Sequence, residues 1–196
     1  MGCHAPQKGV LNICIDLAAC AQKEMDYLLS LGHRRCALLG GESGDALPLS
    51  REAGFDAFLK QRPSRMWGMR VPEQCTPEGG RRAMARVLAM PRPDWPTAVI
   101  CANDLVALGA VREAKRQGVP VPRHMSVMGC DNTYLAEYME PALTTVNINA
   151  PGIGRAAVER LARQAETGEA AEDLIIQGEL VVRSSCAPCE GGGSNG

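Results

Sequence analysis

Short apolar runs alternate with amphipathic stretches along most of the chain. The apolar runs predict strands at residues 10–15, 35–39, 66–71, 97–102, 125–129 and 143–147, with one or two more between 174 and 183. The amphipathic stretches predict helices at residues 17–31, 50–62, 76–90, 103–118 and 151–168. Strands that alternate with helices in this way indicate βαβ units. We therefore expect an α/β fold, an open and mainly parallel sheet with helices on both faces, which explains why the strands are apolar throughout.

Composition excludes several classes of protein. The chain has 196 residues and a formal net charge of −1, so charge gives no argument for nucleic acid or an anionic membrane as a partner of this chain. No apolar run approaches the roughly 18–20 residues that span a bilayer, so no membrane partner is expected. Nine irregularly spaced cysteines, and an amino terminus without an apolar signal segment, favour the cytoplasm.

Neither a catalytic pair nor a metal site emerges from the residue spacing. His4, His33 and His124 have no evident nucleophile as a partner, so we do not expect an enzyme. Cys186 and Cys189 have the spacing of a metal-ligand pair, but zinc needs a second pair and none is nearby. We expect no cofactor and no metal.

Polar side chains follow three of the predicted strands. Strand 35–39 leads through a glycine loop to Arg51, strand 97–102 ends in Asn103, and strand 125–129 is followed by Asp131. Ligands bind beyond the carboxyl ends of the strands in open α/β sheets, and this set of donors and acceptors suits a small polar molecule such as a sugar. Two plainer interpretations stay open: Asn103 can serve only as a helix cap, and Asp131 can belong to an ordinary turn.

Six motifs occur in an order that resembles a known family. They are Leu31-Gly-His-Arg34, Ser50-Arg-Glu-Ala-Gly-Phe55, the segment 96–110 with its Ala-Asn-Asp, Ser126-Val-Met-Gly-Cys-Asp-Asn132, Pro141-Ala-Leu-Thr-Thr-Val146 and Glu179-Leu-Val-Val-Arg-Ser-Ser185. Over residues 10–186 the chain closely resembles the effector-binding region of the lactose-repressor/galactose-repressor (LacI/GalR) family of bacterial transcription regulators. The resemblance implies the fold of type I periplasmic binding proteins and a sugar or another small polar effector that modulates operator binding.

The resemblance also implies roles for individual residues. Arg51, Asn103 and Asp131 match the family's effector contacts, which are the residues that follow the predicted strands. Gln74 lies near a position that often carries an aromatic residue lining the pocket, and we include it as a further effector contact. A polar side chain there departs from the family pattern.

Part of the family pattern is missing from this chain. No helix-turn-helix headpiece precedes residue 10, so operator DNA is expected to be a partner only through a headpiece that this chain lacks. The resemblance divides the chain into a remnant of the amino-terminal effector subdomain (1–15), the carboxy-terminal effector-binding subdomain (16–146), a return helix (147–177), a return strand (178–186) and a flexible tail (187–196). The alternative function is a solute-binding protein of a transport system, which shares this fold.

Two helices lead us to expect a homodimer or a larger assembly. In the family, the helix that follows Ala-Asn-Asp lies at the subunit interface, and here it carries Leu105, Ala107, Leu108 and Val111. The helix at 151–168 lacks the sheet that it covers in the family, so its apolar stripe is expected to be exposed. Burying these apolar surfaces against another copy of the chain would favour association.

Overall fold

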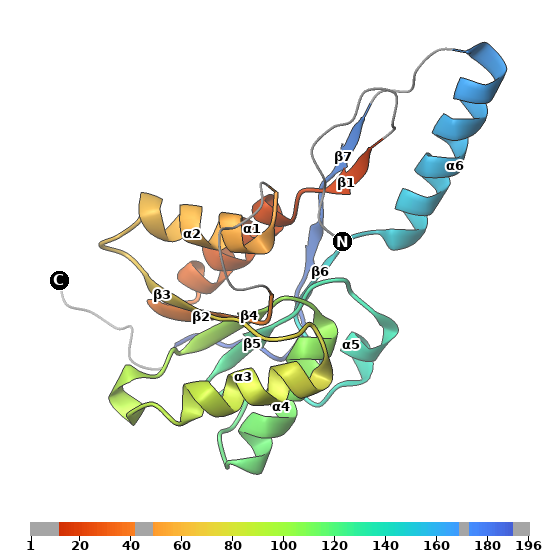
Figure 1. Ribbon diagram of the computed structural model, residues 1–196. Helices are drawn as coiled ribbons and strands as arrows, with labels where there is room; N and C mark the ends of the chain where they lie inside the picture. The colour runs from red at the N-terminus through yellow and green to blue at the C-terminus, as the bar shows by residue number, and fades with distance from the viewer. Residues whose placement is uncertain (1–11, 42–48, 169–172, 190–196) are drawn as a thin grey trace.

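A four-stranded parallel sheet forms the centre of the computed structural model, which describes residues 12–41, 49–168 and 173–189 (Figure 1). Its strand order is β3-β2-β4-β5. The strands are β2 (Arg35–Leu39), β3 (Trp67–Val71), β4 (Ala98–Cys101) and β5 (Ser126–Met128). Because all neighbouring pairs are parallel, the carboxyl ends of the four strands share one edge of the sheet.

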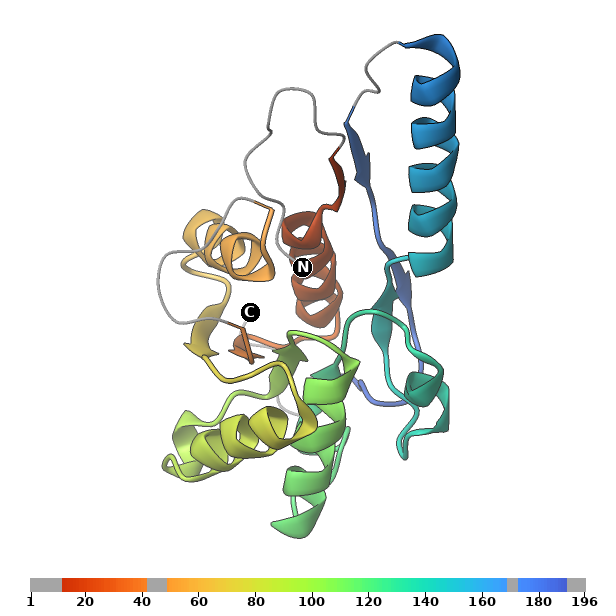
Figure 2. The same cartoon turned by 45° about the vertical axis from the view of Figure 1, so that its right-hand side comes forward.

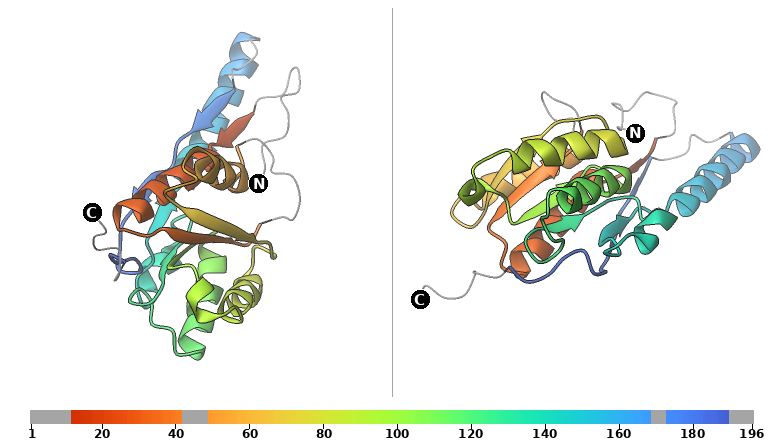
Figure 3. Two further views of the ribbon diagram at one scale, coloured as in Figure 1. Left: turned by 90° about the vertical axis from the view of Figure 1, so that its left-hand side faces the viewer. Right: turned by 90° about the horizontal axis from the view of Figure 1, so that it is seen from below.

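Helices cover both faces of this sheet, as Figure 3 shows. The helices α1 (Leu17–Ser30) and α2 (Arg51–Gln61) pack on one face, and α3 (Pro77–Leu88) and α4 (Asp104–Arg116) pack on the other. Along β2, Cys36 and Leu38 join the core with α1 and α2, whereas Ala37 and Leu39 join the core with α3 and α4. Side chains alternate between the two faces of a strand, so covering both faces requires apolar residues at every position. The predicted fold class is confirmed.

Two glycines allow the helices of each layer to come very close together. A Cβ atom on Gly109 of α4 would lie 1.8 Å from the carbonyl oxygen of Pro77 in α3. A Cβ atom on Gly54 of α2 would lie 2.2 Å from the carbonyl oxygen of Ala18 in α1. Both distances are far inside van der Waals contact, so these helix pairs pack backbone against backbone.

Strands β1 (Ile13–Ile15) and β7 (Leu174–Ile176) and helix α6 (Ala150–Thr167) extend away from the body, as Figure 2 shows, whereas β6 (Thr145–Asn147) lies beside β5. Strand β1 pairs in parallel with β7, and β6 pairs antiparallel with β8 (Glu179–Val181). Helix α6 stands apart, and none of its residues is buried. The predicted exposure of the apolar stripe on this helix is therefore observed.

Most predicted elements appear within two or three residues of their expected bounds, but two were missed. A 3₁₀ helix (Arg92–Asp94) lies in the proline-rich segment between α3 and β4, and a five-residue helix, α5 (Tyr134–Tyr138), follows the Asp131 turn. Both are too short to show a helical period in the sequence. Residues 10–11 of the first predicted strand, the rest of segment 1–11, and residues 190–196 of the predicted tail lie outside the described residues.

Helix α4 exposes less apolar surface than its sequence predicts. Ala107 and Val111 are buried in the core of the same chain, where they pack in the layer formed by α3 and α4. Leu108 is half-buried against that core, and Leu105 is exposed. The helix therefore uses most of its apolar stripe to cover its own sheet.

Candidate functional site

Each of the four parallel strands is followed by one of the predicted site residues. In the order of the sheet, Gln74 follows β3, Arg51 follows β2, Asn103 follows β4 and Asp131 follows β5. The four residues therefore lie at the same carboxyl edge. Neighbouring strands are about 4.8 Å apart, so β3 and β5, the outer strands of the four, are separated by roughly 14 Å.

Arg51 is held by a buried ion pair with Glu24. It is the first residue of α2, which begins at the cap formed where the Ser50 hydroxyl accepts a hydrogen bond from the Ala53 amide over 3.1 Å. Its guanidinium Nη2 donates to Glu24 Oε2 in α1, and the two side chains are 4% and 0% exposed. Among the described residues, Arg51 Nε and Nη1 and Glu24 Oε1 are buried and have no hydrogen-bond partner.

Burial alters the ionisation of this pair. It raises the pKa of the Glu24 carboxyl to about 7, although the positive charge of Arg51 acts in the opposite direction. Buried groups that lack partners are uncommon in native proteins, because each costs about 1–3 kcal/mol of desolvation. The unused donors of Arg51 and the unused acceptor of Glu24 therefore mark this pair as a place where a polar group or water completes the hydrogen bonding.

Asn103 caps helix α4. Its side-chain Oδ1 accepts a hydrogen bond from the Val106 amide over 2.9 Å, and its backbone is extended as an N-cap requires. Asn103 is therefore a helix cap, a role that leaves contact with a ligand open to its amide nitrogen. The cap uses the oxygen of the amide, and none of the described residues accepts a hydrogen bond from its nitrogen, so the half-buried side chain retains two donors at the carboxyl edge.

Asp131 has an unusual backbone conformation. Its φ is +107°, and Asn132 follows with φ +53°, both in the region that non-glycine residues rarely adopt. Residues held there cost of the order of 1–3 kcal/mol and cluster at functional sites. The Asp131 amide donates to the Val146 carbonyl over 2.9 Å, and Arg183 donates to the Asn132 side chain over 2.9 Å, so the surrounding structure fixes this turn.

A second buried acid, Asp104, ties the Asp131 turn to helix α4. Its carboxylate accepts hydrogen bonds from the Thr145 hydroxyl at 2.6 Å and from the amide and hydroxyl of Thr133 at 2.7 and 3.0 Å. The Asp104 amide donates to the Cys130 carbonyl over 2.8 Å. Asp104 thereby holds the loop after β5, the strand β6 and the start of α4 in one arrangement.

The pKa of Asp131 reports its surroundings. Burial and, to a smaller extent, the negative charge of Asp104 raise it to about 6, although the positive charge of Arg51 lowers it. The influence of Arg51 on Asp131 shows that these two predicted residues lie in one electrostatic environment. Gln74 differs from both, because it is exposed in the loop between β3 and α3, where its carbonyl accepts from the Thr76 amide over 2.8 Å.

Glu24 and Asp104 were missed as members of the site. A signal for Glu24 is present in the sequence, since it is a carboxylate on the apolar face of α1 among Cys20, Ala21, Met25 and Leu28, all of which are buried. Asp104 is visible in the sequence beside Asn103, but only the fold shows that both of its oxygens are used internally. Its hydrogen bonds hold the loop that carries Asp131.

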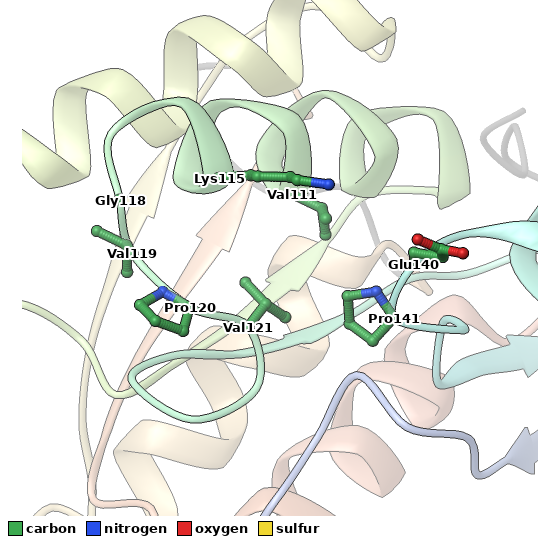
Figure 4. A pocket seen from close by; sticks show the side chains of 8 residues that line it. All are labelled: Val111, Lys115, Gly118, Val119, Pro120, Val121, Glu140 and Pro141. Atoms are coloured by element: carbon green, nitrogen blue, oxygen red, sulfur yellow. The ribbon is translucent and has the colours of Figure 1, made fainter.

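A hollow of about 380 Å³ lies elsewhere in the protein, between the carboxyl half of α4 and two loops (Figure 4). Valines and prolines form most of its wall, with Lys115 and Glu140 as its charged members. None of the four predicted site residues lines this hollow. It therefore belongs to a different part of the surface.

Three further observations concern the part of the chain that the structure describes. No group of three or more His, Cys, Asp or Glu side chains is arranged there to hold a metal ion. No helix there has the length and apolar character needed to cross a membrane. Of the cysteines, Cys14 is disulfide-bonded, and the free thiols are Cys20, Cys36, Cys75, Cys101, Cys130, Cys186 and Cys189.

Comparison with known proteins agrees with this architecture. Residues 25–186 match the model of a periplasmic binding protein-like domain. The HTH-type transcriptional repressor CytR of Escherichia coli (strain K12) is 34% identical over 188 residues, which are 92% of this chain and 53% of CytR. The chain thus spans about half the length of the curated relative that it matches.

Solved structures share the fold. A LacI family transcriptional regulator from Enterococcus faecium with bound ribose is 25% identical, with a TM-score of 0.83 over 95% of this chain and 69% of that one. The lac repressor dimer bound to operator and the anti-inducer ONPF is 25% identical, with a TM-score of 0.77 over 89% of this chain and 60% of that one. The matched domain, the repressor relative and these structures together show that the chain belongs to the LacI/GalR family, as an effector-binding domain with the periplasmic binding protein-like fold.

Proposed function

We propose that this chain binds a small, uncharged polar effector, such as a sugar, at the carboxyl edge of its sheet, and that binding modulates operator recognition by the full-length regulator. Arg51, Asn103 and Asp131 are the central contacts, and Gln74 is a peripheral one. The placement of Arg51, Asn103 and Asp131 after three adjacent parallel strands carries the proposal.

Charge balance argues for an uncharged effector. Glu24 neutralises Arg51 in a buried ion pair, and Asp131 adds a carboxylate close enough for Arg51 to lower its pKa. An anionic ligand would therefore meet no excess of positive charge. Hydroxyl groups both donate and accept hydrogen bonds, which matches an edge that offers amide donors and carboxylate acceptors.

The relatives support a regulator rather than a transport protein. CytR is named as a transcriptional repressor, and the structure from Enterococcus faecium is a transcriptional regulator with bound ribose. For this chain we infer a non-catalytic sensor that works in the cytoplasm and reaches operator DNA only through a headpiece elsewhere in the full-length protein. We also infer assembly as a homodimer or a larger oligomer, in keeping with the dimeric lac repressor.

The division of the chain remains part of the proposal. Residues 16–146 would form the carboxy-terminal effector-binding subdomain, and 1–15, 147–177 and 178–186 would belong to the amino-terminal subdomain and the connections to it. The exposed helix α6 and the pairing of β1 with β7 outside the central sheet support this division. An effector would then be enclosed from the other side by the amino-terminal subdomain, so this chain alone should bind it weakly.

Amide chemical shifts of the labelled chain, titrated with ribose, other uncharged monosaccharides and nucleosides, test the proposal. We expect saturable shifts in the loops that follow β2, β4 and β5, with millimolar dissociation constants. Ribose 5-phosphate should bind no more tightly than ribose, because its phosphate meets no excess positive charge at this edge. Shifts confined to other parts of the chain, or no saturable shift with any compound, would contradict the proposal.

A further inference from the structure

We propose that the opposite edge of the sheet carries a second, separate site, which binds a small phosphate-bearing anion. A hollow of about 190 Å³ lies at the amino ends of β2, β4 and β5. It is built from four separate parts of the chain: the start of β2, the segment 92–97, the loop 122–124, and the residues Pro188 and Cys189 near the carboxyl end. The full length of the sheet separates it from Asp131, roughly 10–15 Å for strands of this size.

Positive charge dominates this hollow. Arg35, Arg92 and Arg123 line it together with His124, and no Asp or Glu is among its lining residues. Within the described residues, none of the ion pairs involves any of these three arginines. Seven arginines elsewhere have a carboxylate partner, whereas Arg34, Arg65 and Arg112 resemble the three of the hollow in having no ion pair among the described residues. The chain thus gathers unneutralised arginines around one small concavity, although its net charge is −1.

The wall of the hollow is fixed by internal hydrogen bonds. His33 is buried at its base, where its ring nitrogens lie 2.9 Å from the Thr97 hydroxyl, 3.0 Å from the Ser126 hydroxyl and 3.1 Å from the Ala187 carbonyl oxygen. These contacts join the start of β2, the start of β4, the start of β5 and the carboxyl-terminal segment. These hydrogen bonds therefore hold the base of the hollow rigidly, together with the segments that carry the arginines.

A backbone contact orients Arg35, and an aromatic contact orients Arg92. The Arg35 guanidinium donates one N–H to the Pro93 carbonyl and keeps the others free. The Arg92 guanidinium lies over the Trp95 ring, 5.6 Å from its centroid, while the Trp95 indole N–H is used by the Met90 carbonyl at 2.9 Å. The indole can therefore contribute its face to a ligand but not its hydrogen-bond donor.

Size and charge together define the ligand class. The hollow is smaller than the roughly 300–1,000 Å³ of pockets for drug-sized ligands, so it suits a single anionic group. Guanidinium forks match the oxygen geometry of phosphates and carboxylates, and several arginines around one point favour a group with two charges over a group with one. A phosphate group fits both conditions, whether as inorganic phosphate or as a small phosphate ester.

Fluorescence of Trp95 provides a direct test, because Trp67, the other tryptophan, lies outside the hollow on β3 and can be removed by Trp67→Phe. Sodium phosphate, glycerol 3-phosphate and sodium acetate would be titrated separately at constant ionic strength, with amide shifts recorded in parallel. We expect saturable changes with a phosphate compound at Trp95, Arg35 and Cys189. Tighter binding of glycerol 3-phosphate would identify a phosphate ester as the ligand, and tighter binding of sodium phosphate would identify the free ion.

Matched variants distinguish a site from general attraction of anions. Arg123→Gln should weaken phosphate binding about tenfold, whereas Arg112→Gln, an equal change of charge at an exposed position of α4 outside the hollow, should leave it unchanged. Equal effects of both variants, equal binding of acetate and phosphate, or no saturable change would each overturn the proposal. Both positions are exposed, so neither substitution should impair folding.

Discussion

Glu24 changes the chemistry expected at the proposed effector edge. The predicted residues Arg51, Asn103 and Asp131 could be found from the sequence, because each follows a recognisable strand. Glu24 could not be found in that way, since its importance comes from the docking of α1 on α2, which brings its carboxylate to Arg51. That contact joins residues 27 positions apart, and nothing in the pattern of either helix specifies it.

The raised pKa of Glu24 predicts a specific dependence of stability on pH. Burial moves this pKa from 4.5 to about 7, so between those values the folded state binds more protons at Glu24 than the unfolded state does. The contribution of this group to the free energy of unfolding is therefore fully present below pH 4.5 and is lost as the pH rises toward 7, by at most about 1.4 kcal/mol per pH unit.

Urea unfolding of the native chain and of Glu24→Gln, at several values between pH 4.5 and 7, isolates this contribution. The difference in unfolding free energy, native minus variant, should fall as the pH rises. Asp131 and His33, whose pKa values are also shifted, are present in both proteins, so their effects cancel in the difference. A difference that stays constant or increases with pH would show that burial does not raise the pKa of Glu24.

At the scale of the elements, the alternation of strands and helices was predictable because a doubly covered parallel sheet gives long apolar runs with clear breaks. Short elements were not predictable. Helix α5 has five residues and buries only Ala136, so its sequence carries no period. The apolar positions of α4 predicted a subunit interface, but Ala107 and Val111 proved to serve the chain's own core, a distinction that depends on how closely α3 approaches.

Gly109→Ala tests the close packing of α3 against α4. Its new Cβ would lie 1.8 Å from the Pro77 carbonyl oxygen, so the helices must separate. We expect a net loss of stability of about 1–3 kcal/mol, because the strain exceeds the gain of about 1 kcal/mol in helix propensity.

Gly154→Ala is the matched control for that substitution. Gly154 lies within the exposed helix α6 and has nothing within 4 Å of the added atom, so the gain in propensity should appear without strain. Denaturant unfolding of both variants gives the comparison. Equal changes in stability for the two variants would contradict the packing described for α3 and α4.

At the scale of the molecule, the chain combines a well-packed body with an extended part that buries little. In helix α6, Val158 is 68% exposed and Leu161 is 55% exposed. Exposed apolar stripes of this kind favour association. We expect light scattering at micromolar concentration to give at least twice the chain mass of 20.9 kDa.

A pair of variants on opposite faces of α6 identifies the surface responsible. Leu161→Arg should weaken association at least tenfold, because it places a charge within the apolar stripe. Glu166→Gln changes the net charge by the same amount on the opposite face and should have little effect. A monomer mass for the native chain would refute the association, and equal masses for the two variants would exclude α6 as the contact.

Asp131 is a central contact of the proposed effector site, and the affinity of Asp131→Asn for ribose tests this role most directly. Asparagine tolerates the positive φ of this position, so the variant should fold normally while losing the charge. Hydrogen bonds to charged groups contribute about 1.5–3 kcal/mol, so we predict a dissociation constant at least tenfold higher than that of the native chain. Asp94→Asn, an equal change of charge in the exposed 3₁₀ helix before β4, should bind ribose like the native chain. Unchanged ribose affinity in Asp131→Asn, or an equal loss in Asp94→Asn, would contradict the assignment of the effector site to the carboxyl edge of the sheet.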